Sequence, residues 1–350
     1  QARSRPCLVH LRTKSNSHFP SPSPPSTDPH THTATASSTA MVAAAMDFES
    51  LALVPAPAEK EQEHVADDAP AAGRSSGGGP AGKSALIKAV RAKQPQLRRV
   101  AHEWLDRYTR GPHAAVAELV SLVLTIADLP SRPELEAEDV QDQDPHDVVQ
   151  EIAAKVASEA AEKGADFTQH WLVSRERGAV RVRENYPALW RELAAAVPCQ
   201  ALLGGLLQQL RGWVLALADC QFRSVRHAAT VAGLQLVEGL GAQCRALREF
   251  CDAAAVQIKD AEAQRAAARL ASLSAELHHS RQCASDLAAA RDALGAGLMS
   301  RRTKDVDPEV RRSCFEALSR WCRADAGAFL GDLWTRYLHF GLSDRDARAR

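Results

Sequence analysis

The 350-residue chain lacks several features that mark common classes of protein. Its 43 basic and 43 acidic side chains cancel, so the net charge gives no argument for nucleic-acid binding, although local patches still permit it. Alternation of Val, Ile or Thr with polar residues is nearly absent, which argues against a sheet. No apolar run reaches the ~20 residues that cross a bilayer. The eight cysteines form no CxxC pair and follow no apolar signal core, so we expect reduced, buried thiols.

Proline and glycine, which interrupt helices, are missing from a long central stretch. No proline lies between Cys199 and Asp307, and no glycine lies between Gly241 and Gly295. The glycine-free stretch is about 53 residues long and rich in Ala, Leu, Arg, Gln and Glu, which favour helix. At 1.5 Å per residue, one uninterrupted helix here would reach roughly 80 Å. Its leucines recur at seven-residue spacing, which predicts lengthwise packing on a helix around 201–218 or on a separate protein.

Changes in composition along the chain predict its organisation. Residues 1–82 are rich in Pro, Ser, Thr, Ala and Gly, so we expect a disordered tail, of which residues 1–40 are a candidate translated leader. Residues 83–240 carry helical periodicity and predict a helical domain. The long charged helix is expected at 241–297, and the first HEAT-like repeats, truncated, at 298–350.

One short motif recurs three times and supports a repeat architecture. An Asp precedes a Val-Arg or Ala-Arg pair in Asp219–Arg226, Asp305–Arg311 and Asp344–Arg350. The last two copies superpose without a gap, and a recurrence of about 40 residues is the period of two-helix HEAT-type repeats. Each helix pair in such an array buries its apolar face by stacking on the next pair. We therefore predict an all-α solenoid in which each Arg hydrogen-bonds the Asp of a neighbouring repeat.

Two stretches of the chain resemble a known family. Residues 221–240 (QFRSVRHAATVAGLQLVEGL) resemble the core of the STAG domain of the stromal-antigen (stromalin) subunits of cohesin, and residues 301–350 resemble the next block of that family. The matching features of the second stretch are Glu309-Val310-Arg311, Cys314, Glu316, Trp321, Ala328-Phe329-Leu330, Asp332, Tyr337, Leu342 and Asp344-Arg345. The chain departs from the family in its alanine-rich long helix and in Phe340, which stands where the family usually has Trp.

The resemblance implies a nuclear, chromatin-associated, non-enzymatic α-solenoid that acts in sister chromatid cohesion. Members of this family bind the kleisin subunit of the cohesin ring, contact DNA without reading its sequence, and help to load or retain the ring on chromatin. We therefore expect the kleisin, the ring complex and DNA as partners, and no membrane, small-molecule substrate, cofactor or metal. The alternatives that remain open are a different HEAT-repeat adaptor, in transport or phosphatase assembly, and a P-loop NTPase.

Two groups of basic side chains are candidates for DNA contacts. The first group is Arg175, Arg177, Arg181 and Arg183, and the second, expected in a loop, is Arg301, Arg302 and Lys304. Residues 83–110 add eight Lys and Arg against two carboxylates. Such groups give salt-sensitive binding to phosphates without sequence readout. The alternative is a solvated helix face together with internal Asp-Arg bonds, and we favour that structural role for Arg226, Arg311 and Arg350.

Three aromatic residues near the end of the chain are candidates for binding a partner. Trp334, Tyr337 and Phe340 are spaced i, i+3 and i+6, so they share one helix face. Such a face either packs in a core or binds a partner, and the spacing alone leaves both open. The resemblance favours Phe340, because family members hold an aromatic peptide motif with an aromatic side chain near this place.

Two patterns that suggest chemistry lack the context that the chemistry needs. Gly77–Ser84 (GGGPAGKS) matches the phosphate-binding loop, with Lys83 and Ser84 in the lysine and metal-hydroxyl positions. That loop requires a buried strand before it, and the preceding residues, ADDAPAAGRSS, do not form one. His278, His279 and Cys283 lack the further ligands of a zinc site. No Ser-His-Asp or Cys-His set has supporting context, so the sequence predicts no catalytic site.

Overall fold

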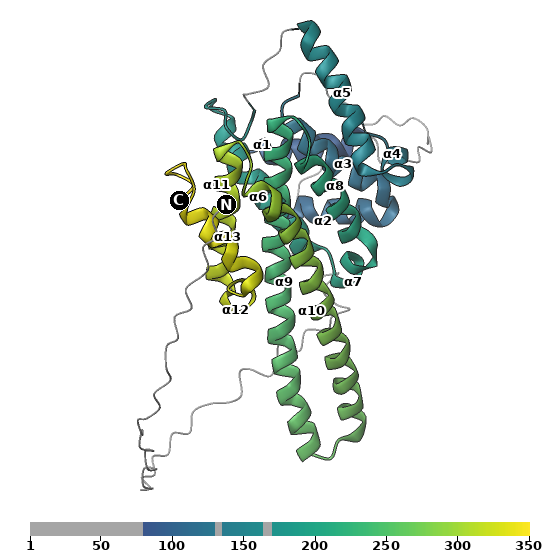
Figure 1. Cartoon of the computed structure of the whole chain (residues 1–350). Coiled ribbons are helices and arrows are strands. Elements are labelled where there is room, and N and C mark those ends of the chain that lie inside the picture. The colour runs from purple at the N-terminus through teal and green to yellow at the C-terminus, as the bar shows by residue number, and fades with distance from the viewer. Residues whose placement is uncertain (1–79, 130–134, 164–169) are drawn as a thin grey trace, which may run out of the picture. The chain divides into compact units, whose positions relative to one another are not determined.

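The computed structural model describes residues 80–129, 135–163 and 170–350, and every regular element in these ranges is helical. The predicted all-α class is therefore confirmed. The helices belong to one compact unit (Figure 1). In chain order they are α1 (Pro80–Arg91), α2 (Leu97–Arg110), α3 (Pro112–Ile126), α4 (Ala137–Asp142), α5 (Pro145–Lys163), α6 (Ala179–Ala196), α7 (Cys199–Ala201), η2 (Leu202–Leu206), α8 (Leu207–Ala218), α9 (Arg223–Ala263), α10 (Ala267–Arg302), α11 (Pro308–Ala324), α12 (Ala326–Phe329) and α13 (Asp332–Leu342). The predicted tail lies outside the described residues, apart from Pro80–Gly82 at the start of α1.

Helix α9 forms the most extensive helix–helix contacts among the described residues. Helices α6, α8, α10 and α11 all contact it, and Figure 1 shows α9 and α10 as a long antiparallel pair that extends past the other helices. Many buried positions of α9 are small, among them Ala228, Ala229, Ala232, Gly233 and Gly239. A Cβ at Gly239 would lie 2.5 Å from the Cβ of Ala194 in α6, so this position requires glycine. Small side chains on α9 therefore allow its neighbours to approach closely.

The prediction of one uninterrupted helix over 241–297 is wrong. The chain turns back at 264–266, so the stretch is divided between α9 and α10. The partner predicted for this stretch is also corrected, because α10 packs mainly on α9 and contacts α8 less extensively. The predicted leucine seam lies along this contact: Leu277, Leu287 and Leu294 are all buried. Folding back thus buries a face that a single straight helix would leave in water.

The turn between α9 and α10 has the hydrogen bonds of a Schellman motif. The amide of Ala266 donates to the carbonyl of Ala261, and the amide of Arg265 donates to the carbonyl of Glu262, each at 3.0 Å. Arg265 takes φ 55°, in the left-handed region where helices usually place glycine. Because arginine stands at this position, the sequence gives no local sign that the helix ends here.

The apolar segment Cys199–Ala218 has the length and hydropathy of a membrane-spanning helix, and about half of it is buried inside this structure. The segment is not one straight helix, because Gly205 takes φ 121° within the π-helical turn η2. That conformation is open to glycine and strained for other residues. Helix α8 then packs on α5 and α9, so the segment forms part of the protein core.

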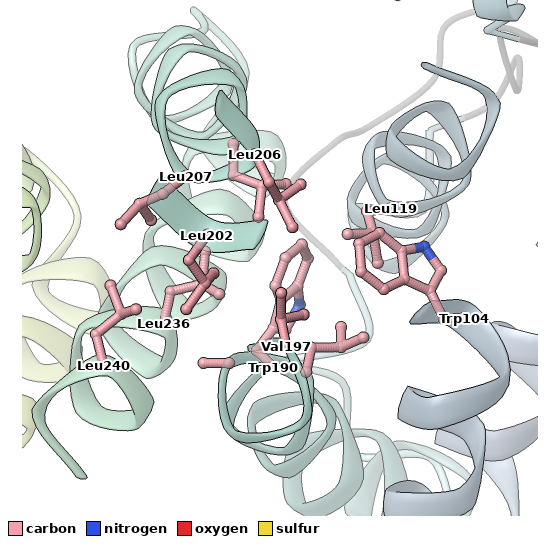
Figure 2. A pocket seen from close by; sticks show the side chains of 12 residues that line it. Trp104, Leu119, Trp190, Val197, Leu202, Leu206, Leu207, Leu236 and Leu240 are labelled. Atoms are coloured by element: carbon pink, nitrogen blue, oxygen red, sulfur yellow. The ribbon is translucent and has the colours of Figure 1, made fainter. Parts of the chain in front are cut away.

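Figure 2 shows a small cavity that α2, α3, α6, η2, α8 and α9 enclose between them. Trp104, Leu119 and Trp190 lie on one part of its wall, and leucines such as Leu206 and Leu236 lie on another. Its volume is about 10 Å³, close to the space that one water molecule occupies. The cavity is therefore a packing void in the core and is too small for an organic ligand.

A buried hydrogen-bond chain links the turn before α6 to α9 and α11. His170 Nε2 lies 3.1 Å from His227 Nδ1, and His227 Nε2 lies 3.2 Å from the hydroxyl oxygen of Ser313. That hydroxyl donates to the carbonyl of Glu309, so it accepts from His227 Nε2–H. His227 Nδ1 is then the acceptor of the proton on His170 Nε2. This arrangement requires the His227 imidazole to be neutral, because a proton on His227 Nδ1 would face the His170 donor.

The histidine pair predicts a loss of stability in mild acid. Burial, together with His170, lowers the pKa of His227 to about 3. Below the ordinary imidazole pKa of about 6.5 the unfolded chain binds the proton and the folded chain does not, so stability falls as the pH falls. We expect this group to reduce the free energy of unfolding by about 2 kcal/mol between pH 7.5 and pH 5, measured by urea unfolding.

The control for this effect is an exposed histidine on α10. His227→Gln keeps a donor toward Ser313 but has no titrating group, so its acid loss should be smaller than that of the parent chain. His278→Gln should retain the full acid loss, since His278 is exposed. An acid loss of the same size in His227→Gln and in the parent chain would contradict the assignment.

Candidate functional site

The predicted Asp-Arg bonds between successive repeats are present. Arg226 Nε lies 3.0 Å from Asp305 Oδ2 and its Nη2 lies 3.2 Å from Oδ1, which is a bidentate pair. Arg311 forms the same pair with Asp344, at 2.7 and 2.9 Å. The recurrence of the motif along the sequence thus corresponds to contact between one turn and the next. We call these two pairs the Asp-Arg ladder, and the prediction that generated them is confirmed.

Each ladder arginine also binds the turn that precedes its own helix. The Nη1 group of Arg226 donates to the carbonyls of Cys220 and Gln221, six and five residues earlier. Arg311 and Arg350 donate at the same two offsets in their own turns. One guanidinium therefore closes its own turn and, in Arg226 and Arg311, also holds the carboxylate of the next turn.

The ladder carboxylates are held in their ionised form. The hydrogen bond from Arg311 lowers the pKa of Asp344 to about 2. Burial acts to raise the pKa of Asp305, but the hydrogen bonds from Arg226 and from the Asp307 amide outweigh it, so the pKa is lowered. The ladder is therefore fully charged at neutral pH, and its charges are satisfied inside the protein.

Arg301, Arg302 and Lys304 lie beside this ladder. The expectation that all three occupy a loop is wrong for Arg301 and Arg302, which end α10. Both arginines pair with Asp219, and Arg302 Nη1 also lies 2.8 Å from Asp305. Lys304 Nζ lies 5.4 Å from the centre of the Phe340 ring. The positive charges of the two arginines therefore already have carboxylate partners.

The other basic group has a different setting. Arg175 and Arg177 lie in the turn before α6, and Arg181 and Arg183 lie in its first turns. Arg183 Nη1 donates to the carbonyl of Ser174, which holds the turn against the helix. Arg175, Arg177 and Arg183 are exposed and Arg181 is half-buried. No ion pair engages any of the four within the part of the chain that the structure describes.

A fifth arginine joins this group from α1. The guanidinium of Arg91 lies 4.6 Å from the centre of the Trp171 ring, in the same turn that carries Arg175. A cation stacked on an aromatic face stays charged and keeps its donors free at the edge. We call Arg91, Arg175, Arg177, Arg181 and Arg183 together the arginine surface. The sequence identified four of its members, but the stacking of Arg91 on Trp171 joins positions 80 residues apart and had no local signal.

The three aromatic candidates do not share one environment. Trp334 and Tyr337 are buried, with 1% and 2% of their surfaces exposed. The Trp334 ring packs against Trp321 and Phe329, so the core role that the spacing left open applies to it. Phe340 is 40% exposed and lies between the Tyr337 ring and Lys304. Among the three, Phe340 is the side chain that a partner can reach.

Exposed apolar side chains lie near Phe340 in the sequence. Leu333 lies about two helical turns before Phe340 on α13 and is 37% exposed, and Leu342 is 73% exposed. Leu330, just before the helix, is 51% exposed. These leucines are not among the binding residues predicted from the sequence, although Leu333 and Phe340 are spaced i and i+7 and so share a helix face. We call Phe340 and Leu333, which share this face, the apolar surface of α13.

The structure gives no support to the chemical sites that sequence patterns suggest. Gly82–Ser84 lie in the first turns of α1, Gly77–Gly79 lie outside the described residues, and the described ranges contain no strand. Those ranges also contain no group of three or more His, Cys, Asp or Glu that fits a metal ion. The Ser313–His227–His170 chain is not a nucleophile and its base, because the Ser313 proton is donated to a carbonyl.

Comparison with known proteins identifies two domains. The STAG domain model matches residues 168–276, and the stromalin conservative domain model matches residues 304–350. The arginine surface, apart from Arg91, falls in the first domain, and the apolar surface of α13 falls in the second. Both stretches are therefore similar to the stromal-antigen family of cohesin subunits, and the resemblance seen in the sequence is confirmed.

Individual relatives agree with this assignment. The chain is 24% identical to sister-chromatid cohesion protein 3 of Arabidopsis thaliana, over 76% of this chain and 24% of the relative. It is 24% identical to human cohesin subunit SA-3, over 76% of this chain and 21% of the relative. The chain thus spans about a quarter or less of these relatives. The solved structure of cohesin subunit Scc3 from Z. rouxii has the same fold, with a TM-score of 0.66, 17% identity, and coverage of 76% of this chain and 31% of that one.

The ladder geometry predicts that lysine will not replace arginine there. Arg311→Lys keeps the charge but loses the bidentate pair with Asp344 and the bonds to the Asp305 and Val306 carbonyls. Arg311 and Asp344 are 15% and 6% exposed, so the lost bonds are partly shielded from water. We expect a loss of about 1–2 kcal/mol in the free energy of unfolding, measured by urea unfolding.

The matched substitution is Arg348→Lys, in an arginine that is 62% exposed and pairs with Glu309 and Asp346. Exposed pairs contribute little, so this variant should unfold like the parent chain. Equal losses for the two variants would show that the ladder has no special structural role.

Proposed function

We propose that this chain acts as a non-enzymatic scaffold of cohesin, which binds the kleisin subunit of the ring and DNA in the nucleus during sister chromatid cohesion. The STAG and stromalin conservative domains support a cohesin role, and the similar proteins are cohesin subunits by name. The helical architecture supports a scaffold, because its described surface offers long faces while its core cavity is too small for a substrate.

The observation that carries the DNA part of the proposal is the arginine surface. Its arginines lie at the end of α1, in the turn before α6 and in the first turns of α6, and no ion pair joins them to a carboxylate among the described residues. Binding phosphate therefore does not require breaking an internal ion pair. The group at Arg301 and Arg302 would first have to give up Asp219 and Asp305. We therefore assign the main DNA contact to the arginine surface, and Lys304 and its neighbours to a minor role at most.

Reversing charge on the arginine surface tests this assignment. In Arg175→Glu/Arg177→Glu, two phosphate contacts are lost, so the Kd for any duplex should rise at least about tenfold at 100 mM salt. The slope of log K against log salt should fall by about 2, because each phosphate contact contributes about 0.9. Fluorescence anisotropy with two duplexes of unrelated sequence measures both quantities.

The control carries the same change in charge elsewhere. Arg269 and Arg281 are exposed on α10, so Arg269→Glu/Arg281→Glu changes the net charge equally without touching the arginine surface. If both double variants lose the same affinity, DNA responds to the overall charge and the assignment to this surface is wrong. A loss confined to one duplex sequence would contradict sequence-independent binding.

The kleisin part of the proposal rests on the apolar surface of α13. An exposed aromatic that shares a helix face with the exposed Leu333 suits an apolar segment of a partner, and Lys304 adds a positive charge at its edge. Phe340→Ala should weaken binding of the kleisin at least about tenfold in calorimetric titration, since aromatic anchors commonly dominate such contacts. Val256→Ala is the control, because Val256 is 59% exposed on α9. A folded Phe340→Ala protein with full kleisin affinity would refute this part and leave the DNA part standing.

A further inference from the structure

Three cysteines from different helices converge where the long hairpin meets the rest of the protein. Cys199 comes from α7, Cys244 from α9 and Cys283 from α10, and all three are buried. Cys199 Sγ lies 3.9 Å from the carbonyl oxygen of Cys283. Burial and the adjoining Cys283 thiol raise the pKa of Cys199 to about 12, and Cys244 adds to the effect. The Cys199 thiol thus lies beside the backbone of Cys283, although 84 residues separate the two cysteines.

An exposed base stands at the outer edge of this pair. His279 Nε2 lies 3.6 Å from Cys283 Sγ, one helical turn away on α10. The side-chain amide of Gln200, next to Cys199, lies 3.5 Å from the same nitrogen. His279 and Gln200 are both exposed, and Cys283 retains 8% of its surface. A small oxidant in the solvent therefore has access to one thiol that has an imidazole beside it and a second thiol behind it.

We propose that Cys283 and Cys199 form a peroxide-sensitive thiol pair that closes to a disulfide between α10 and α7. His279 takes the Cys283 proton, and the resulting thiolate attacks one oxygen of hydrogen peroxide. The new S–O bond replaces the O–O bond, hydroxide leaves, and the proton from His279 converts it to water. Cys283 is then a sulfenic acid.

Cys199 completes the reaction. Its sulfur attacks the sulfur of the sulfenic acid, the S–O bond breaks, and hydroxide leaves and takes up the Cys199 proton as water. The sum is two thiols and one hydrogen peroxide giving one disulfide and two waters. The thiols lose two electrons and two protons, and the peroxide gains them. Thioredoxin-type dithiols would reverse the change by thiol–disulfide exchange.

The consequence is mechanical. Cys199 begins α7, which immediately precedes η2 and its kink at Gly205, whereas Cys283 lies near the middle of α10. A covalent bond here would fix the second arm of the hairpin to the start of the apolar segment 199–218. Oxidation would therefore limit how far the hairpin can move relative to the core, without changing the arginine surface.

The test oxidises the folded full chain with hydrogen peroxide and maps its cysteines by mass spectrometry without reduction. We expect a loss of two hydrogens in a crosslinked pair of peptides that carry Cys199 and Cys283, reversed by dithiothreitol. Cys199→Ser should stop at the sulfenic acid of Cys283, trapped by dimedone. His279→Gln should slow the oxidation of Cys283 about tenfold at pH 7. Cys244→Ser, the matched buried control, should still form the disulfide at the parental rate.

Three results would overturn the proposal. One is a disulfide that joins Cys199 to Cys244 in the parent chain. Another is a parent chain in which Cys283 ends as a sulfinic acid with no crosslink. The third is a rate of Cys283 oxidation that His279→Gln leaves unchanged. Because His279 is exposed, this last variant is expected to fold, so the test stands even if a cysteine variant does not.

Discussion

Close packing around α9 is the constraint on which the other features depend. Helices α6, α8, α10 and α11 all lie against it, and small residues on α9 set how near they come. At Gly233 an added Cβ would lie 2.5 Å from a methyl group of Leu298 and 2.6 Å from one of Val214, so α8 and α10 both meet α9 at this level. Interiors packed this tightly leave little room for the helices to slide. The turns that carry the arginine surface and the ladder are positioned by these contacts.

The Asp-Arg ladder acts mainly by fixing the orientation of one helix pair against the next, and less by adding free energy. A partly exposed ion pair contributes little by itself, but a planar guanidinium that binds two carbonyls and a carboxylate fixes three directions at once. Arg226 and Arg311 use this to set one helix pair against the next. Carboxylates and arginines pair with one another throughout this region. Arg301 and Arg302 at the end of α10 are therefore neutralised by Asp219 and Asp305. An arginine available to phosphate has to lie away from the ladder, as the turn before α6 does.

The parts that the sequence predicts are those whose signal is local or periodic. Helical class follows from composition, and the pairing of Arg311 with Asp344 follows from a repeated motif. Phe340 is singled out by the family resemblance, whereas its exposure depends on what packs over Tyr337. The turn at Arg265 could not be predicted from local sequence, because the glycine that usually takes this backbone conformation is absent. The turn is stabilised instead by the burial of the α10 leucines after the chain folds back. The His170–His227 pair escapes it because the two residues are 57 positions apart and only the fold brings them together.

Zero net charge is therefore a poor guide to what the molecule binds. Six exposed carboxylates lie along α4 and α5, from Glu136 to Glu151, while the exposed arginines Arg175, Arg177 and Arg183 lie on the turn before α6 and at its start. Opposite charges that are separated on a surface create local potentials even where their sum is zero, and those potentials act within about 10 Å at ordinary ionic strength. Near the arginine surface a polyanion would experience a positive local potential. The net charge of the whole chain matters only at longer range. What such a surface can bind depends on which charged side chains have no internal partner. The packing around α9 sets which side chains pair inside the protein.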